Sequence, residues 1–306
     1  MKQPVIKPQI LRPDDTIGIA APASPFDQQA FERGISVFES MGYRVKMPDN
    51  LFSRQGYLTG SDSERASQLM KLFEDESVMA ILCARGGFGS MRLLPLLDFE
   101  IISALPKVFL GCSDITALLV AIYNRCGMIT FHGPLVTTLT RESEKTCSAL
   151  IDAIGSRQPL VLKPKKAAVL NPGQASGPLV GGNLTTLCHL MGTPYEPRFK
   201  GHLLFLEDRG EAPYRIDRML SQLRLGGRLD GVAGVILGSF QDCGPLEDVH
   251  AIVQEAFRHT AIPILAGFDI GHGIDNLTVP IGIEAKLDTA DATLRFKESA
   301  INEETG

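Results

Sequence analysis

The sequence lacks tryptophan, and it has no long hydrophobic run. Its longest apolar stretches, at positions 78–84 and 117–123, have seven residues each, whereas a membrane-spanning helix needs about 20. The first fifteen residues, MKQPVIKPQILRPDD, do not contain the apolar core of a secretory signal. We therefore predict a cytoplasmic protein that does not interact with membranes.

Positive charge is also scarce, because 30 Lys and Arg residues stand against 35 Asp and Glu residues and give a net charge of −5. Without a basic surplus to neutralise a phosphate backbone, nucleic acid is not expected as a partner. The six cysteines are scattered with no Cys-x-x-Cys pair, which indicates ordinary thiols and not a disulfide framework. Hydrophobic residues make up 44% and charged residues 21%, as in globular proteins.

What the sequence does contain is an alternation of short β-rich runs and amphipathic helical runs. Its 306 residues suit one large domain or two ordinary ones. In the first half we expect strands at 16–20, 43–46, 78–84 and 107–111, and helices at 27–41, 62–74, 91–97 and 115–124. Asp27 and Asp62 are the expected N-caps. This alternation predicts βαβ units and a parallel sheet covered on both faces.

The composition of the sequence changes between positions 156 and 177, where Lys, Pro and Gly are frequent and the hydrophobic residues show no helical periodicity. We predict an N-terminal α/β domain at 1–157, a connection at 158–177 that can include a short strand, and a C-terminal α/β domain at 178–306. A glycine-rich turn leading into a helix opens the second half. Strands follow at 202–206, 232–238 and 262–267, with helices at 215–223 and 246–257. The alternating pattern after Gly282 predicts an antiparallel hairpin or an edge strand.

Four segments carry residues suited to chemistry, and the first is LGCSDI (110–115), where a strand ends and a helix begins. Ligands of open parallel sheets bind at the carboxyl ends of strands. A Ser113 hydroxyl beside helix N-terminal N–H groups would sit where an oxyanion can be held, although the segment matches only half of the Gly-x-Ser-x-Gly elbow. Two other interpretations stay open: Ser113 or Asp114 caps the helix, or Cys112 is the nucleophile.

The second segment is RGGFGS (85–90), which also follows a strand. Successive glycines allow backbone N–H groups to converge on an anion. The segment is neither Gly-x-Gly-x-x-Gly nor a nucleoside-triphosphate loop, so a dinucleotide or triphosphate is disfavoured. A cradle for a carboxylate or an oxyanion fits the pattern, and a tight turn that packs a helix against a strand is the alternative.

The third segment, LLFLEDRGE (203–211), runs from an apolar strand into two acids. Neighbouring residues of a strand face opposite sides, so only one of Glu207 and Asp208 can face a given site. An acid at the end of a buried strand is suited to orient a histidine. The alternative is the start of a solvated loop.

The fourth segment, FDIGHGID (268–275), places His272 between two glycines. Asp269, His272 and Asp275 could instead ligate a metal, although no HExxH motif is present, and a structural histidine is a further interpretation. A serine becomes nucleophilic when a base takes its proton, and an acid fixes the tautomer of that base. The sequence therefore offers one candidate for each role, in the order Ser, acid, His.

Seven motifs taken together resemble the LD-carboxypeptidase family of serine peptidases. These motifs are ARGGFGS, GCSDITALL, FHGP, VGGNLTTLCHLMGTP, FLEDRGEAPYRIDRML, ILGSF and GFDIGHGIDNLTVPIG. They follow the order and spacing of the family, and the resemblance covers nearly the whole chain.

The resemblance implies a flavodoxin-like or Rossmann-like N-terminal domain with a parallel sheet, and a smaller C-terminal α/β domain. It also implies a triad without metal or other cofactor, with Ser113 as nucleophile, Glu207 as acid and His272 as base. Similar family members remove the terminal D-alanine from murein tetrapeptides during cytoplasmic peptidoglycan recycling, and they commonly form homodimers. The expected partner is thus a murein tetrapeptide or a related small peptide.

Around this triad we assign further roles. Backbone N–H groups of Asp114 and Gly87 are expected to hold the oxyanion. Arg85, or the Gly86–Gly87 N–H groups, would bind the terminal carboxylate of the substrate.

Two more residues of the second half are expected to bind the peptide. Asn183, which follows two glycines, could hydrogen-bond the peptide, and Glu211 could meet the free ammonium of diaminopimelate or lysine.

Three alternatives to this function remain. The microcin C immunity peptidases resemble this chain through the same triad, but they need a platform for a nucleobase, and aromatic stacking would have to come from Phe or Tyr because tryptophan is absent. A metal-dependent hydrolase would use the fourth segment. A non-catalytic two-domain protein would bind a peptide without cleaving it.

Overall fold

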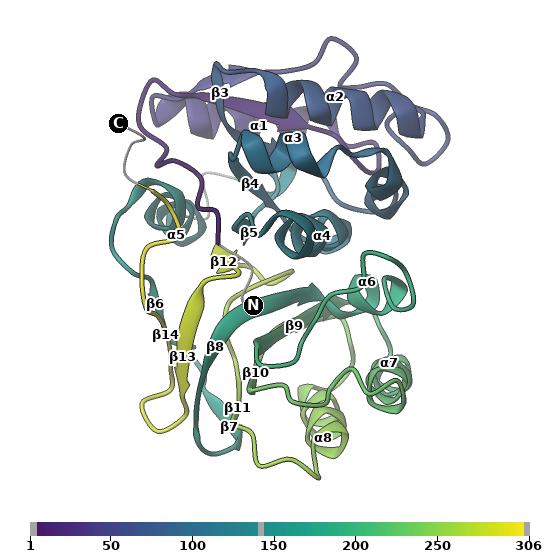
Figure 1. The fold of residues 1–306 in the computed structure, drawn as a ribbon, viewed down its shortest axis with the longest axis vertical. Coiled ribbons are helices and arrows are strands. Elements are labelled where there is room, and N and C mark those ends of the chain that lie inside the picture. Colours follow the sequence, from purple (N-terminus) through teal and green to yellow (C-terminus); the bar gives the residue numbers. More distant parts are fainter. Residues whose placement is uncertain (1–4, 140–143, 303–306) are drawn as a thin grey trace.

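The computed structural model describes residues 5–139 and 144–302, which form a mixed α/β structure with two sheets (Figure 1). The first sheet has the order β12-β5-β4-β3-β1-β2. Its strands are β1 (Thr16–Ala20), β2 (Arg44–Lys46), β3 (Val78–Cys83), β4 (Val108–Gly111), β5 (Thr130–His132) and β12 (Val279–Ile281). Strands β1 to β5 are parallel, whereas β12 is antiparallel to β5. The order β2-β1-β3-β4-β5 is the flavodoxin-like one, in which ligands bind where the order reverses, between β1 and β3.

Helices and 3₁₀ turns connect these strands. They are α1 (Gln28–Ser40), α2 (Asp62–Glu74), α3 (Phe99–Ala104), α4 (Thr116–Cys126), α5 (Glu144–Gly155), η1 (Ser90–Leu96), η2 (Ser113–Ile115) and η3 (Val136–Thr138). Asp27 caps α1 as predicted, whereas the cap of α2 is Ser61 and not Asp62. Asp62 instead pairs with Arg65 and Arg92. The predicted helix at 91–97 is the 3₁₀ segment η1, which contains a proline that cannot donate a helical hydrogen bond.

The second sheet has the order β6-β14-β13-β8-β9-β10-β11-β7. Its strands are β6 (Val161–Leu162), β7 (Ala168–Asn171), β8 (Gln174–Asn183), β9 (Leu203–Arg209), β10 (Gly234–Gln241), β11 (Ile264–Ala266), β13 (Glu284–Asp288) and β14 (Thr293–Phe296). Strands β8 to β11 are parallel, and helices α6 (Leu184–His189), α7 (Pro213–Leu225) and α8 (Leu246–Ala256) follow three of them. The hairpin of β13 and β14 is antiparallel, as predicted.

Pairing in the two sheets differs from the predicted organisation in three places. The segment 158–177 contains β6, β7 and the start of β8, so it belongs to the second sheet and is not a separate connection. Strand β12 lies within 178–306 but pairs with the first sheet. The expected turn at Gly181 is part of β8, and a Cβ atom there would lie 1.9 Å from the Phe205 carbonyl oxygen, so glycine permits the close approach of β9.

Helix α4 lies between the two halves of the molecule (Figure 1). It contacts β4 and β5 on one side and β8 and α6 on the other, and residues 116–122 are all buried. This explains why the sequence of α4 is apolar on all faces. Because α4 begins directly after η2, the fold places residue 113 at the junction of the two halves.

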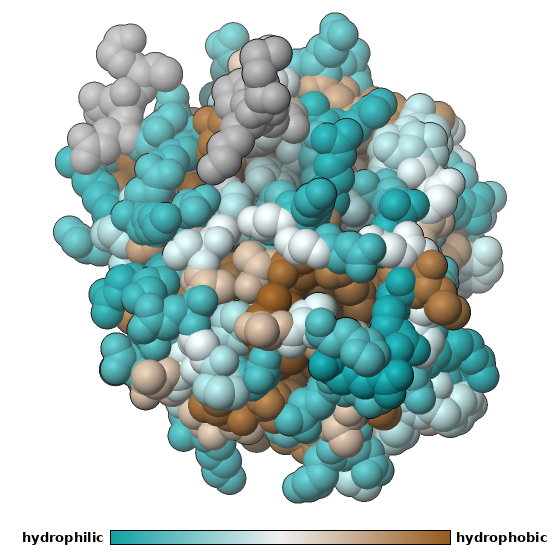
Figure 2. All heavy atoms as spheres, turned by 60° about the horizontal axis from the view of Figure 1, so that its bottom comes forward, coloured by the Kyte–Doolittle hydropathy of each residue, from teal (hydrophilic) through white to brown (hydrophobic). Residues whose placement is uncertain are grey.

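The surface is mixed in polarity. On the face shown in Figure 2, hydrophobic residues gather across the middle and hydrophilic residues surround them. Within residues 5–139 and 144–302, no helix is both long and apolar enough to cross a membrane.

Candidate active site

Ser113 occupies a sharp turn between β4 and α4. Its φ angle is +61°, a left-handed conformation that costs a residue other than glycine about 1–3 kcal/mol and that is concentrated at functional sites. Ser113 caps neither η2 nor α4, and Asp114 uses its carboxylate to accept the Ser90 N–H at 2.8 Å. The capping interpretation is therefore wrong, since the Ser113 hydroxyl does not cap either helix.

The glycine turn after β3 lies directly against Ser113. A Cβ atom on Gly86 would come within 2.9 Å of the Ser113 Cβ, so this approach requires glycine. Gly87 has a φ angle of +104°, and a Cβ there would lie 2.5 Å from the Ser24 hydroxyl oxygen. Ser24 fixes the turn, because its N–H donates to the Gly86 carbonyl at 3.2 Å and its hydroxyl accepts the Phe88 N–H at 3.1 Å.

Glu207 and His272 form a buried pair. His272 Nδ1 lies 2.6 Å from Glu207 Oε2, and Glu207 is completely buried. Gly271 has a φ angle of +105°, and a Cβ there would lie 2.5 Å from the same Glu207 oxygen. Glycine is therefore required at position 271, because a side chain there would collide with the Glu207 carboxylate.

The charge of Glu207 controls the protonation of His272. Burial alone would lower the pKa of His272, but the hydrogen bond and the negative charge of Glu207 outweigh burial and raise this pKa above its ordinary value. A neutral His272 donates from Nδ1 to the carboxylate, which leaves Nε2 as the proton acceptor. This is the tautomer that a general base requires.

Asp208, the strand neighbour of Glu207, faces the other side of β9, as expected for a strand. Its carboxylate accepts the Asn183 side-chain N–H at 2.9 Å and both the N–H and the hydroxyl of Thr185. The Asn183 side-chain oxygen accepts the N–H and the hydroxyl of Thr186, so Asn183 caps α6. The structure thus gives Asn183 a structural role and shows no free acceptor for the predicted peptide contact.

Two other predicted binding residues have partners within the chain. Glu211 lies 3.4 Å from Arg215, four residues further on. Arg85 donates to the carbonyl of Pro25. Its guanidinium nevertheless keeps further N–H donors.

The three residues of the metal-binding alternative, Asp269, His272 and Asp275, have other partners in the structure. Asp269 lies 2.5 Å from Lys145, and Asp275 lies 3.2 Å from Lys165 and 3.5 Å from Lys145. His272 is paired with Glu207. In the part of the chain that the structure describes, no three metal-ligating side chains cluster. The two aspartates instead tie the loop that carries His272 to α5 and to the segment after it.

Asn276 was missed by the sequence analysis. Its side-chain oxygen accepts the Gly271 N–H at 2.8 Å, and its side-chain nitrogen lies 3.7 Å from the Cys112 sulfur. Its own N–H donates to the Thr146 hydroxyl at 3.1 Å. Asn276 therefore connects the residue before the candidate base to the residue before the candidate nucleophile, and only its place in the GHGIDN motif could have drawn attention to it.

Two buried titratable groups, Cys112 and His132, lie close enough to Glu207 and His272 to be affected by their charges. Burial, followed by the charge of Glu207, raises the pKa of the Cys112 thiol, so Cys112 stays protonated and is a poor nucleophile. Burial, followed by the charge of His272, lowers the pKa of His132 to about 3. His132 packs edge-on against Phe205 at 4.9 Å between ring centres, and within the described residues neither of its ring nitrogens has a hydrogen-bond partner.

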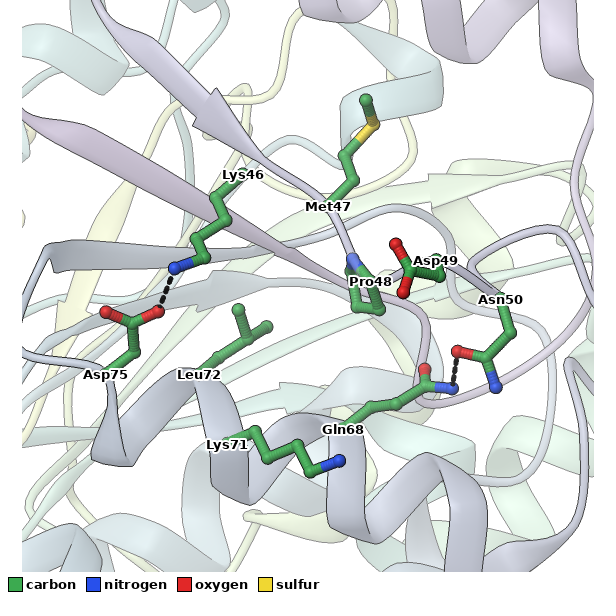
Figure 3. A pocket seen from close by; sticks show the side chains of 9 residues that line it. All are labelled: Lys46, Met47, Pro48, Asp49, Asn50, Gln68, Lys71, Leu72 and Asp75. Carbon is green, nitrogen blue, oxygen red and sulfur yellow. Dashed lines mark hydrogen bonds and ion pairs between the residues drawn. The ribbon is translucent and has the colours of Figure 1, made fainter.

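A pocket of about 320 Å³ beside β2 and α2 does not belong to this site (Figure 3). Four of its polar side chains pair with one another, since Lys46 pairs with Asp75 and Gln68 donates to Asn50. None of the predicted site residues lines it.

The family follows from direct comparison. A profile described as the LD-carboxypeptidase N-terminal domain matches residues 17–133, and one described as the LD-carboxypeptidase C-terminal domain matches residues 176–287. The chain belongs to the LD-carboxypeptidase family. It is accordingly a serine-type carboxypeptidase, and the predicted resemblance and enzyme class are confirmed.

Relatives of this LD-carboxypeptidase match nearly the whole length of the chain. A probable murein peptide carboxypeptidase of Bacillus subtilis is 40% identical over 301 residues, which are 94% of this chain and 93% of the relative. The structure of the muramoyltetrapeptide carboxypeptidase of Oxalobacter formigenes is 30% identical, with a TM-score of 0.83 over 95% of this chain and all of that one. MccF in complex with glutamyl sulfamoyl guanosine is 27% identical, with a TM-score of 0.90 over 97% and 99% of the two chains.

Proposed function

We propose that this LD-carboxypeptidase removes the terminal D-alanine from murein tetrapeptides in the cytoplasm, as part of peptidoglycan recycling. The observation that carries the proposal is the buried 2.6 Å contact between His272 and Glu207, together with the left-handed turn at Ser113. These are the parts of a serine acyl-transfer site. Relatives named as murein peptide and muramoyltetrapeptide carboxypeptidases support the choice of substrate.

The proposed reaction proceeds through an acyl-enzyme. His272 Nε2 takes the proton of Ser113 as its oxygen attacks the carbonyl carbon that precedes D-alanine. The amine of D-alanine leaves with that proton, and a water molecule, deprotonated by His272, then cleaves the ester and regenerates Ser113. Glu207 keeps His272 in the required tautomer and stabilises its charged form during both steps.

The oxyanion of each tetrahedral intermediate would be held by backbone N–H groups of Asp114 and Gly87. Removing one such donor typically costs about 10²–10³ in kcat. The support for this assignment is the close approach of the glycine turn to Ser113, with Gly86 against its Cβ.

The ends of the substrate would be recognised on either side of Ser113. Arg85 or the Gly86–Gly87 N–H groups would bind the terminal carboxylate, and Glu211 would exchange its 3.4 Å contact with Arg215 for the ammonium of the third residue. Asn183 would contact the peptide through its second side-chain N–H, because the first donates to Asp208 and the side-chain oxygen caps α6. A homodimer is also part of the proposal, and sedimentation of the purified chain tests it.

A second candidate function is the cleavage of peptidyl-adenylates, as in the microcin C immunity peptidases that the chain resembles; the microcin C7 self-immunity protein MccF of Escherichia coli is 30% identical to it. One observation favours it: Tyr57 and Phe88 are 62% and 48% exposed and lie edge to face, 5.7 Å apart, next to the glycine turn. Such a pair could stack on a nucleobase in a chain without tryptophan.

Mass spectrometry of two parallel reactions separates the two functions. The wild-type enzyme is incubated with L-Ala-γ-D-Glu-diaminopimelate-D-Ala and, separately, with a peptidyl-adenylate, both in the presence of EDTA. We expect the tetrapeptide to lose one alanine at the higher rate. Preferential cleavage of the peptidyl-adenylate would instead establish the second function.

A further inference from the structure

A recess of about 510 Å³ opens at the carboxyl edge of the first sheet. Its walls come from the loops that follow β1, β2 and β3, and they include Ser24, Arg54, Tyr57 and Arg85. The loops after β1 and β3 flank the point where the strand order reverses. In sheets of this order, that crevice is the usual place for a ligand.

Two guanidinium groups give the recess a positive wall. Arg85 donates to the Pro25 carbonyl, and Arg54 Nε donates to the Gly56 carbonyl at 3.4 Å. A single carbonyl partner holds each guanidinium in place but leaves its charge and most of its five N–H donors available.

These two charges have no ion-pair partner in the part of the chain that the structure describes. Across residues 5–139 and 144–302, neither Arg54 nor Arg85 forms an ion pair with a carboxylate. Asp27 lies on the same wall, but its carboxylate accepts the Ala30 N–H at 2.7 Å as the cap of α1. In a chain with a net charge of −5, two arginines without ion-pair partners outnumber the one acid of this recess, and this excess of positive charge favours an anionic ligand.

The recess is connected to the candidate nucleophile through the glycine turn. Ser24 forms part of the recess wall, and its hydroxyl holds the Phe88 N–H. A Cβ on Gly87 would overlap Ser24, and a Cβ on Gly86 would overlap Ser113. Only this two-residue turn therefore separates the positive wall from the Ser113 side chain.

We propose that Arg54, together with Arg85, binds the carboxylate of the residue that leaves. The inference rests on the proposed function, because an enzyme that removes only a terminal residue must recognise its free carboxylate. The planar fork of a guanidinium suits a carboxylate better than an ammonium does. Arg54 is thus a specificity-determining residue, and the ligand of the recess is a peptide with a free carboxyl terminus.

The test compares the tetrapeptide with its C-terminal amide, for the wild type and for Arg54→Gln. We expect Arg54→Gln to lower kcat/KM for the free acid by about tenfold, mainly through KM, because one charge-assisted contact is lost. The amide lacks the charge that Arg54 binds, so its kcat/KM should hardly change. Arg54→Lys keeps the positive charge but loses the planar guanidinium, so its kcat/KM for the free acid should lie between those of the wild type and Arg54→Gln.

Arg44→Gln is the matched control. Arg44 is also exposed and also held by a backbone carbonyl, that of Asp14 at 2.7 Å, but it begins β2 at the opposite edge of the sheet. Its kinetics should equal those of the wild type. The subsite proposal is wrong if the wild type cleaves the tetrapeptide but Arg54→Gln lowers kcat/KM equally for the acid and the amide. It is also wrong if the substitution lowers kcat/KM for neither substrate. If the wild type cleaves neither substrate, the proposed function itself fails and the subsite falls with it.

Discussion

Glu207 shows how one side chain defines the chemistry of this site. It is fully buried, and its Oε2 meets His272 Nδ1 at 2.6 Å. A buried carboxylate is costly unless it is paired, so the folded state holds His272 in a fixed place and orientation. The pairing also raises the pKa of His272 against the effect of burial.

The first prediction concerns pH. Because the pKa of His272 is raised, its basic form should be lost as the pH falls through a value above about 6.5, the ordinary pKa of histidine. The acid limb of kcat/KM should lie in that range. In Glu207→Gln the negative charge beside His272 is lost, while burial and the charge of Arg209 still lower its pKa, so the limb should move to lower pH and kcat should fall by about 10³- to 10⁴-fold.

A pH–rate profile of both proteins measures this directly. The same pair should stabilise the folded state most fully below the unfolded pKa of about 6.5, and lose this contribution as the pH rises through the folded pKa. An acid limb that stays in place in Glu207→Gln would show that another group controls the rate.

Local sequence was enough to single out these residues as candidates but not to predict all of their contacts. The glycines around His272 and the acid at the end of β9 are readable because each reflects a steric or periodic requirement of one segment. The capping contact of Asn183 with Thr186 is local, whereas its contact with Asp208 of the neighbouring strand was not readable from the sequence. Asn276 was missed for the same reason, since its partners are 130 and 164 residues away in the sequence.

At the scale of elements, the loop between β11 and β12 is held from both sides. Asp269 and Asp275 pair with Lys145 and Lys165 outside the loop. Asn276 holds the Gly271 N–H within it and contacts Cys112 of the neighbouring half. The position of the candidate base relative to Ser113 therefore depends on contacts that neither residue makes itself.

The second prediction follows from this loop. Asn276→Ala should lower kcat by about 10- to 100-fold with little change in KM, because a small misplacement of a catalytic group has a large cost. Steady-state kinetics on the tetrapeptide measure the split. Asn171→Ala is the matched control, since the Asn171 side chain donates to the Ile262 carbonyl away from the site. A lower melting temperature with an unchanged kcat would limit Asn276 to a structural role.

The elements themselves were largely predictable, and their pairing was less so. The alternation of strands and helices in both halves is confirmed, because burial periodicity is a local property. The pairing of β6 and β7 in the second sheet, and of β12 in the first, depends on partners distant in sequence. Composition alone suggested a connection at 158–177, since Pro, Gly and Lys are common both in connections and in edge strands.

At the scale of the whole molecule, the proposed site would draw its residues from both halves. Ser113 follows β4 of the first sheet, whereas Glu207 and His272 come from β9 and from the loop after β11 in the second. Helix α4, which begins just after Ser113, packs against β4 and β5 of the first sheet and against β8 and α6 of the second half. The flavodoxin-like order of the first sheet also explains why the glycine turn and the Arg54–Arg85 recess meet at one edge.

The measurement that tests this account most directly is the rate of D-alanine release from the tetrapeptide by Ser113→Ala, compared with the wild type. Circular dichroism of both proteins confirms that the fold is kept. The account predicts a loss of about 10⁴-fold or more, because without the hydroxyl there is no nucleophile for His272 to activate. A rate within about tenfold of the wild type would contradict a serine acyl-enzyme at this position.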